Sequence, residues 1–248
     1  VYSPAKYGIL TELLPPEKLV AANGWIEGLT VTSIILGTVM GGALVSGHVS
    51  DMLLSIDIPL INTGITSKTE AALCVVVGIY VLATLANLKI PDTGCVYAHQ
   101  ERNPIKLITD FANCYSILWK DKLGQITLAV TTLFWGAGAT LQLIVLEWAK
   151  QSLNMPFDKA TSLVGVVAIG VAAGAVLSAR FIPLRKSLTV IPLGIAMGVI
   201  VMMMTQVHSV WIAYPLLVLI GALSGFFVVP MNALLQHRGH VLMSAGHS

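Results

Sequence analysis

The sequence predicts an all-α fold, specifically a polytopic membrane helix bundle. Hydrophobic residues make up 56% of the 248-residue chain and charged residues only 10%, whereas soluble domains carry roughly 25% charged residues. The mean hydropathy is +0.83. The apolar residues also gather in runs long enough to cross a bilayer. A chain so poor in charge cannot cover a water-facing surface, so most of its surface must meet lipid.

Six segments have the length and composition of membrane spans. A span needs about 20 mostly apolar residues, because the hydrocarbon core is ~30 Å thick and a helix rises about 1.5 Å per residue. The last of the six contains Pro215 and Pro230, which a span tolerates when neighbouring groups satisfy the freed carbonyls. Residues 1–14 have the character of the tail of an earlier span. The six segments are 19–47, 71–90, 123–149, 160–179, 188–206 and 211–235.

A longer polar stretch, residues 91–122, separates the second span from the third. Its apolar residues recur every three or four positions, which predicts one apolar helix face. This helix either lies at the membrane surface, with Trp119 at headgroup depth, or packs on the underside of the protein itself. The residues of the apolar face are Ile105, Ile108, Phe111, Tyr115 and Leu118.

The basic residues are distributed unequally between the two sides of the predicted spans. One side receives three of the fourteen, Lys68, Lys150 and Lys159, and the other side receives the remaining eleven. The positive-inside rule makes the richer side cytoplasmic, including residues 91–122 and 180–186. A net charge of +2, without basic clusters that include aromatic residues, gives no indication of nucleic-acid binding.

Small residues four positions apart predict close helix packing in lipid. The pairs are Gly37 and Gly41, Gly170 and Gly174, Gly194 and Gly198, and Gly221 and Gly225.

Motifs for catalysis or metal binding are not found. The three cysteines, Cys74, Cys95 and Cys114, have no ligand spacing and are expected to be free thiols or small apolar fillers. The sequence contains no nucleophile elbow, phosphate loop or paired catalytic carboxylates. We therefore expect no metal, no cofactor and no enzymatic activity.

The two ends of the chain echo each other faintly, with a proline and a following apolar pair at Pro4 and at Pro230. The pattern fits a protein of two similar halves. Four blocks resemble the lysophospholipid transporters of the major facilitator superfamily. These blocks are SPAKYGIL (3–10), KLVAANG (18–24), LFWGAG (133–138) and GFFVVPMNALLQ (225–236).

The resemblance implies a partial major facilitator fold, because that family has twelve spans in two six-helix halves. Residues 1–90 would be the end of the N-terminal half, with the tail of span 4 and spans 5 and 6. Residues 91–122 would form the cytoplasmic linker. Residues 123–248 would hold spans 7 to 10 of the C-terminal half and stop before span 11. We therefore expect the chain to be an internal fragment of a transporter.

The function that the resemblance implies is transport of lysophospholipids, such as lysophosphatidylethanolamine, inward across the bacterial inner membrane. Surrounding membrane lipids, and an acyltransferase or acyl-ACP synthetase that restores the second acyl chain, are the implied partners. Two alternatives remain open. One is a major facilitator exporter of drugs or other amphiphiles, and the other is a non-transporting membrane anchor fused to an acyltransferase.

The strongest candidate for a functional residue is Glu27, which lies within the first full span. A carboxylate at the centre of a span costs ~2.5–3.5 kcal/mol on insertion scales. Asn23 is four residues earlier and projects from the same face. The pair predicts a polar patch for a lipid headgroup or a coupling ion. The alternatives are an interfacial glutamate in water or a structural hydrogen bond between helices.

Five other residues are candidates for substrate contact. Trp135 and Gln142 lie two turns apart on one face of the third full span, although the family pattern in enterobacteria has a basic residue where this chain has Gln142. Lys6 and Tyr7 lie where a helix meets the cytoplasm, and Lys6 is either a phosphate ligand or a snorkelling anchor. Asn232 is placed to satisfy a carbonyl freed by the nearby proline.

Overall fold

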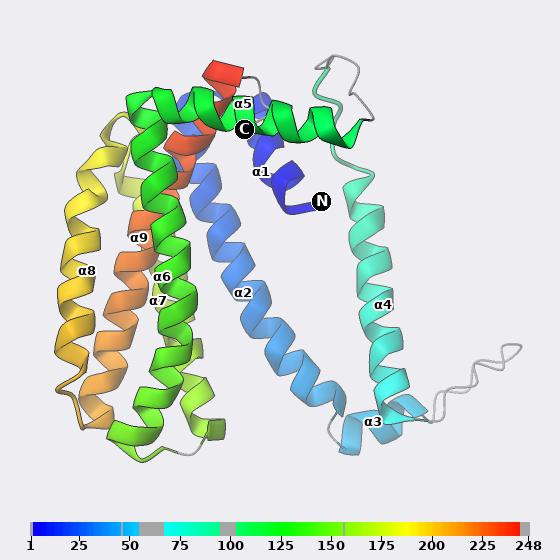
Figure 1. The fold of residues 1–248 in the computed structure, drawn as a ribbon. Helices are drawn as coiled ribbons and strands as arrows, with labels where there is room; N and C mark the ends of the chain where they lie inside the picture. Colours follow the sequence, from blue (N-terminus) through cyan, green and yellow to red (C-terminus); the bar gives the residue numbers. More distant parts are fainter. Residues whose placement is uncertain (1, 46, 55–66, 95–102, 156, 244–248) are drawn as a thin grey trace, which may run out of the picture. The chain divides into compact units, whose positions relative to one another are not determined.

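The computed structural model describes residues 2–45, 47–54, 67–94, 103–155 and 157–243, and every regular element within these ranges is a helix. Figure 1 shows these elements along the chain. The predicted all-α fold is confirmed. The elements in order are α1 (Tyr2–Leu13), η1 (Pro16–Lys18), α2 (Leu19–Val45), α3 (Gly47–Leu54), α4 (Lys68–Asn87), α5 (Pro104–Lys120), α6 (Lys122–Leu153), α7 (Phe157–Phe181), η2 (Leu184–Val190), α8 (Ile191–Met204) and α9 (Val210–Met243).

Six helical segments of the described chain are long and apolar enough to cross a membrane, which confirms the predicted number of spans. The predicted and observed boundaries differ mainly at the ends of α6 and α9, because polar residues extend both helices beyond their apolar cores. Helix α9 contains both Pro215 and Pro230 and still runs as one helix of 34 residues. The six segments are Pro16–Gly37, Lys68–Asn87, Lys122–Leu153, Ser162–Phe181, Leu184–Met204 and Val210–Met243.

The contacts divide the chain into two compact units. The first unit contains Val1–Thr32 and Thr93–Ser248, and the second contains Ser33–Asp92. Helix α2 therefore contributes its N-terminal part to the first unit and its C-terminal part to the second. The transporter halves that the sequence suggests, 1–90 and 123–248 around a linker at 91–122, are a different kind of division and stay a prediction.

The second unit is held at one end by polar contacts. Helix α3, which the sequence analysis did not predict, packs against α4. Asp51 of α3 pairs with Lys68 at the start of α4, with 3.0 Å between the charged atoms. Ser67 caps α4: its Oγ accepts from the Glu70 backbone N–H at 3.2 Å, and the Glu70 carboxylate accepts from the Ser67 N–H at 3.0 Å. This reciprocal capping fixes where the span begins.

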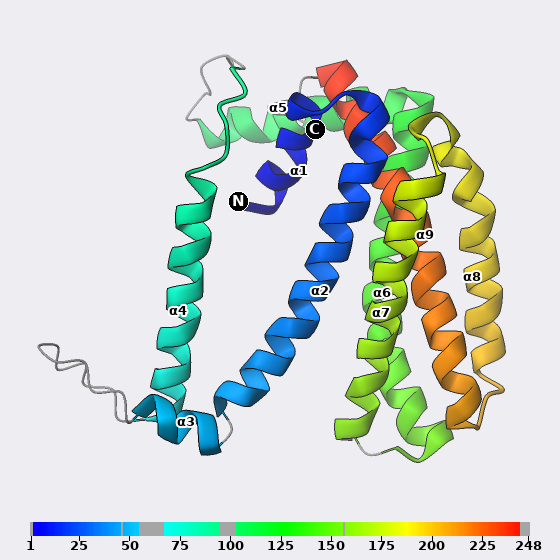
Figure 2. The ribbon, with the colours of Figure 1, turned by 180° about the vertical axis from the view of Figure 1, so that it is seen from behind.

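The first unit is organised around the contact between α7 and α9, which Figure 2 shows from behind. A Cβ atom at Gly174 would lie 1.9 Å from the carbonyl oxygen of Ala222, and one at Gly221 would lie 2.1 Å from that of Val167. Only glycine fits at such distances, so the two helix backbones touch directly. Helices α6 and α8 pack against α9 on other sides.

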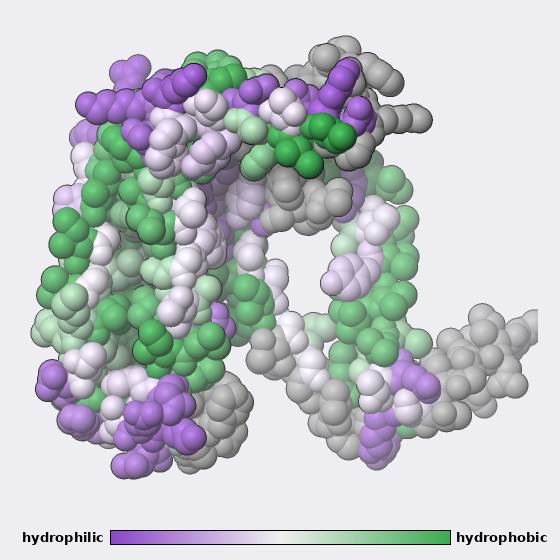
Figure 3. Space-filling view, in the orientation of Figure 1, coloured by the Kyte–Doolittle hydropathy of each residue, from purple (hydrophilic) through white to green (hydrophobic). Residues whose placement is uncertain are grey.

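Polar and apolar side chains follow the pattern of a membrane protein in the first unit. Figure 3 shows apolar side chains over the middle of α6 and α8 and hydrophilic side chains at both ends of these helices. Many large apolar residues are exposed there, including Leu143 at 70% and Ile195 at 70%. An apolar band between polar ends is the arrangement that a bilayer requires.

Helix α5 forms where the sequence predicts an amphipathic helix. Asn103 caps its start by accepting from the Ile105 backbone N–H at 3.1 Å. Its apolar face is largely unburied, with Ile108 70% and Phe111 73% exposed, while Leu118 is buried near the junction with α6. Four of the five residues of this face are thus exposed within the first unit, and whether the helix lies on a membrane surface or packs under the protein stays a prediction.

Candidate functional site

Polar side chains from α1, α2 and α9 meet inside the first unit and form what we call the polar patch. It consists of Lys6 and Tyr7 of α1, Asn23, Glu27 and Thr30 of α2, and Gln236 of α9. Of the sequence-predicted site residues, the structure brings Lys6, Tyr7, Asn23 and Glu27 together here.

An amide pair joins α2 to α9 at this patch. The Asn23 Nδ2 donates to Gln236 Oε1 at 2.8 Å, and the Gln236 Nε2 donates back to Asn23 Oδ1 at 2.9 Å. Asn23 Nδ2 also donates to the Leu19 carbonyl at 2.9 Å, and the residue is only 3% exposed. The patch therefore includes a structural hydrogen bond between helices, and this bond involves Asn23, not Glu27.

Glu27 lies one turn further along α2 and is 8% exposed. The carboxylate makes no hydrogen bond or ion pair with any residue that the structure describes. Lys6 and Tyr7 are close enough to act on it electrostatically. A carboxylate inside a bundle without a direct partner is costly and often marks a functional position.

Lys6 reaches this region from α1. Its Nζ lies 3.3 Å from Thr30 Oγ1, and Thr30 in turn donates to the Ile26 carbonyl at 2.7 Å. The ammonium also stands over the Tyr7 ring, 4.8 Å from its centroid, which is the geometry of a cation–π contact. The side chain is half-buried and contacts α2, and its role as phosphate ligand or as snorkelling anchor stays a prediction.

The patch places opposite charges close together without joining them in a salt bridge. The carboxylate of Glu27 can accept hydrogen bonds from an ammonium group or take up a cation. The ammonium of Lys6 can hold a phosphate as a point charge. A zwitterionic headgroup presents both of these charges, so the arrangement has the chemistry to bind one.

Two predicted residues lie apart from the patch. Trp135 is 52% exposed and packs edge-on against Phe134, with ring centroids 5.7 Å apart. Gln142 is exposed on the same helix. No hydrogen bond or ring contact among the described residues connects either side chain to Glu27. Their role in substrate contact stays a prediction.

The expectation that Asn232 satisfies a carbonyl freed by Pro230 is wrong for the described part of the chain. Asn232 is half-buried, and its side chain makes no hydrogen bond there. The side chain of α9 that bonds to α2 is that of Gln236, four residues later.

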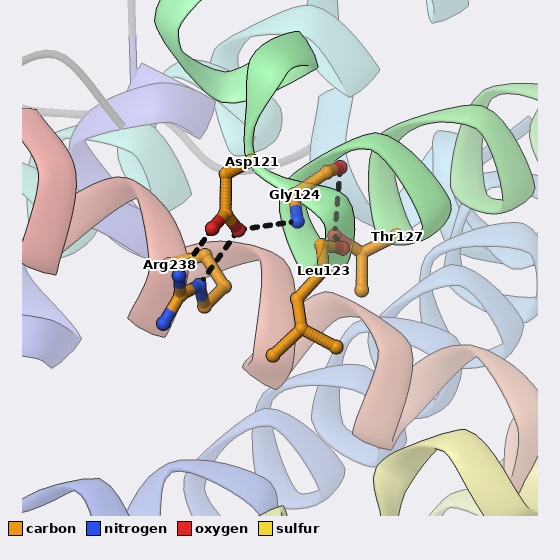
Figure 4. Close-up of polar contacts among 5 residues, drawn as sticks. All are labelled: Asp121, Leu123, Gly124, Thr127 and Arg238. Atoms are coloured by element: carbon orange, nitrogen blue, oxygen red, sulfur yellow. Dashed lines mark hydrogen bonds and ion pairs between the residues drawn. The ribbon is translucent and has the colours of Figure 1, made fainter.

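Three contributing residues were not singled out from the sequence. Gln236 and Thr30 belong to the patch, and their signal was a polar side chain within an otherwise apolar run. Arg238 was counted only as a cytoplasmic charge, but it forms a two-pronged ion pair with Asp121: its Nε donates to Oδ2 at 2.9 Å, and a second N–H donates to Oδ1. Figure 4 shows this pair at the start of α6.

Asp121 has two roles. Besides binding Arg238, its Oδ2 accepts from the Gly124 backbone N–H at 2.8 Å and so caps α6. The hydrogen bond from Arg238 is the main reason that the pKa of Asp121 lies below its ordinary value, and the Gly124 N–H also lowers it. The pair ties the beginning of α6 to the end of α9.

Among the described residues, no group of three or more histidine, cysteine or acidic side chains is arranged to hold a metal ion. Cys74 is exposed and Cys114 is partly buried, and both are free thiols. Cys95 lies outside the described residues.

The fold defines a class: an all-helical, multi-pass membrane protein, in which polar and charged side chains meet between helices. The sequence profile of the Major Facilitator Superfamily matches residues 1–243. The chain therefore belongs to the Major Facilitator Superfamily.

Individual curated proteins show a more specific similarity than the superfamily profile does. The chain is 38% identical over all of its 248 residues to the lysophospholipid transporter LplT of Photorhabdus laumondii, covering 57% of that protein. It is also 38% identical to the LplT proteins of Yersinia enterocolitica and Yersinia pestis, covering 56% of each. The chain thus spans about half the length of the curated relatives it matches. No solved structure matches it.

Proposed function

We propose that the protein containing this chain transports lysophospholipids across the bacterial inner membrane, inward, so that a cytoplasmic acyltransferase or acyl-ACP synthetase can reacylate them. Similarity to LplT proteins over the whole chain supports the substrate class. The single observation that carries the proposal is the polar patch, where Glu27 is buried beside Lys6 without a direct partner.

The two charges of the patch match the two charges of lysophosphatidylethanolamine. Glu27 would accept the ammonium of the headgroup, and Lys6 would attract the phosphate. Such charge-assisted contacts are worth more than neutral hydrogen bonds, especially where water is excluded. The single acyl tail would lie along apolar helix surface, of which α6 has a large share, including the half-exposed Trp135.

Movement would follow the general scheme of the superfamily, in which two helix halves rock around a site between them. The amide pair of Asn23 and Gln236 joins α2 to α9. Two amides can exchange partners with each other, with water or with a headgroup at low cost, because each carries both donors and acceptors. The pair would therefore stabilise one conformation of the transporter without preventing the change to the other conformation.

The test is uptake of lysophosphatidylethanolamine by proteoliposomes. A chimera in which this chain replaces the matching region of the Photorhabdus laumondii relative should show saturable uptake. The chain alone should show none, because it covers little more than half of such a transporter. A folded chimera that transports no lysophospholipid, or that prefers unrelated cationic amphiphiles, would contradict the proposal and favour an exporter.

A further inference from the structure

We propose that a cavity between the start of α6, η2 and the end of α9 is a binding site for the phosphodiester group of an anionic phospholipid. The cavity has a volume of about 220 Å³. It combines basic side chains with leucines, and it is lined by Leu123, Leu184, Arg185, Leu188, Leu234, His237 and Arg238.

The basic side chains are arranged for an anion. Arg185 is exposed and makes no hydrogen bond or ion pair with any residue in the described ranges. Arg238 is held in place by Asp121, which takes two of the five N–H donors of the guanidinium and leaves three. Guanidinium groups match the geometry of phosphate oxygens, so a fixed arginine and a free one form a suitable pair.

Carboxylates near the cavity do not cancel this charge. Asp121 is already paired with Arg238. Glu17 of η1 is the other acidic group near His237, but it does not line the cavity. Arg185 therefore keeps an uncompensated positive charge at its edge.

The leucines point to a lipid and not to a small soluble anion. Leu234 is 7% exposed, and Leu184 and Leu188 are half-buried, whereas Arg185 is exposed. Polarity thus falls from the arginine toward the buried leucines. A phospholipid has the same order, with the phosphate outside and the glycerol and first methylenes inside. Inorganic phosphate has no apolar part that could pack against the leucines.

The position of the cavity agrees with this occupant. It lies where α6 begins, where η2 connects α7 to α8 and where α9 approaches its end, which is the surface level of the spans. The distribution of lysine and arginine predicts that this side is cytoplasmic. Anionic lipids are concentrated there, and basic pockets between spans on this side bind their headgroups.

The site is separate from the polar patch. On α9, Gln236 is turned toward Asn23 of α2. Arg238, two residues later, projects from nearly the opposite side of the helix, toward Asp121 of α6. This second lipid site therefore does not depend on the proposed transport function, and a failure of uptake would leave it standing.

The experiment measures lipid binding to the purified chain in detergent by native mass spectrometry. Phosphatidylglycerol is titrated against phosphatidylcholine, with inorganic phosphate and tail-free glycerophosphoglycerol as competitors. The test variant is Arg185→Gln. The matched control is Lys186→Gln, which removes the same charge from a neighbouring exposed position that does not line the cavity.

We expect phosphatidylglycerol to bind at least tenfold more tightly than phosphatidylcholine, and Arg185→Gln to weaken it about tenfold. Lys186→Gln should change binding less than twofold, and neither soluble competitor should displace the lipid at equal concentration. Equal binding of the two lipids, or equal losses in the two variants, would overturn the proposal. Displacement by inorganic phosphate would show that the cavity binds anions in general, and would overturn its assignment as a lipid site.

Discussion

Helix α9 meets its neighbours α7 and α2 in two contrasting ways. Against α7 it places glycines, so that backbone touches backbone and a Cβ at Gly221 would lie 2.1 Å from a carbonyl oxygen. Against α2 it places the amide of Gln236, which exchanges hydrogen bonds with Asn23 over 2.8 and 2.9 Å. The first contact leaves no room for rearrangement, whereas the second can be broken and formed again.

This difference separates the rigid part of the first unit from the part suited to change. Close packing of small residues gives many van der Waals contacts and allows one arrangement only. Amide pairs in membrane proteins contribute modestly, with measured couplings averaging ≈ 0.6 kcal/mol, because alternative partners exist. We therefore expect mutations at the α7–α9 contact to affect folding, and mutations at the α2–α9 side to affect transport.

The largest effect is expected for Gly174→Ala. The new methyl group would lie only 1.9 Å from the carbonyl oxygen of Ala222. The helices would have to separate, at a cost of about 3 kcal/mol or more, the upper end for overpacking. Folded yield and thermal unfolding in detergent measure the loss.

Gly198→Ala is the matched control for that variant. Gly198 is also inside a span, and a Cβ there would meet nothing within 4 Å. This variant should be neutral or slightly more stable, since alanine favours helix over glycine by up to about 1 kcal/mol. Similar losses in both variants would show that the α7–α9 contact is not special.

The next effect concerns Glu27 and is measured as uptake by the chimera. Glu27→Gln keeps the side-chain size and removes the charge. Uptake of lysophosphatidylethanolamine should fall tenfold or more, as for the loss of one charge-assisted contact of ~1.5–3 kcal/mol. Folded yield should remain close to that of the parent chimera.

Comparison of two substrates decides what Glu27 binds. If the carboxylate holds the ammonium of the headgroup, an anionic lysophospholipid should lose less uptake than the ethanolamine lipid. If it holds a coupling cation, the losses should be equal. Full uptake of both substrates would remove Glu27 from the site and leave it as a structural residue.

A smaller effect is expected for the amide pair. Gln236→Leu leaves the amide of Asn23 with only the Leu19 carbonyl as partner, so stability should fall by about 1 kcal/mol. A double-mutant cycle with Asn23→Leu should recover part of that loss, with a coupling between roughly 0.6 and 1.7 kcal/mol. Exposed Gln125→Leu serves as the control. A coupling of zero would mean that the two amides do not depend on each other.

The sequence predicted the helices well because their signal is local. Apolar runs and the bilayer thickness are sufficient to find all six spans, and apolar spacing is sufficient to find α5. Glycine spacing was less informative: it marked Gly194 and Gly198 as clearly as Gly170 and Gly174, yet a Cβ at Gly198 would meet no described atom within 4 Å. Spacing shows that a close approach is possible, not that it occurs.

The site was predicted in part, for a physical reason. Glu27 and Asn23 stand out because polar groups in a span are costly wherever they lie. Their partners could not be inferred, since Gln236 and Arg238 are more than a hundred residues from the side chains that they bind. Such pairs depend on how helices pack, and the helical period alone does not determine packing.

The smallest effect is expected for Asp121→Asn, which tests whether the end of α9 is also fixed. Asparagine can still cap α6, so the variant removes the charge of the pair with Arg238 and little else. Both side chains are partly exposed, at 20% and 24%, and the loss should be about 0.5 kcal/mol at neutral pH.

The pKa of Asp121 determines the pH range in which its pair with Arg238 contributes to stability. The pKa of Asp121 is lowered in the folded protein, mainly by its hydrogen bond from Arg238. The pair's contribution is therefore fully present above the ordinary aspartate value of 3.8 and disappears as the pH falls through the lower folded value. Stability of parent and variant, followed by thermal unfolding in detergent, should differ at pH 7 and converge in strong acid. A difference that persists unchanged in acid would show that Asp121 stabilises the protein through its cap, and that the charge pair with α9 contributes nothing.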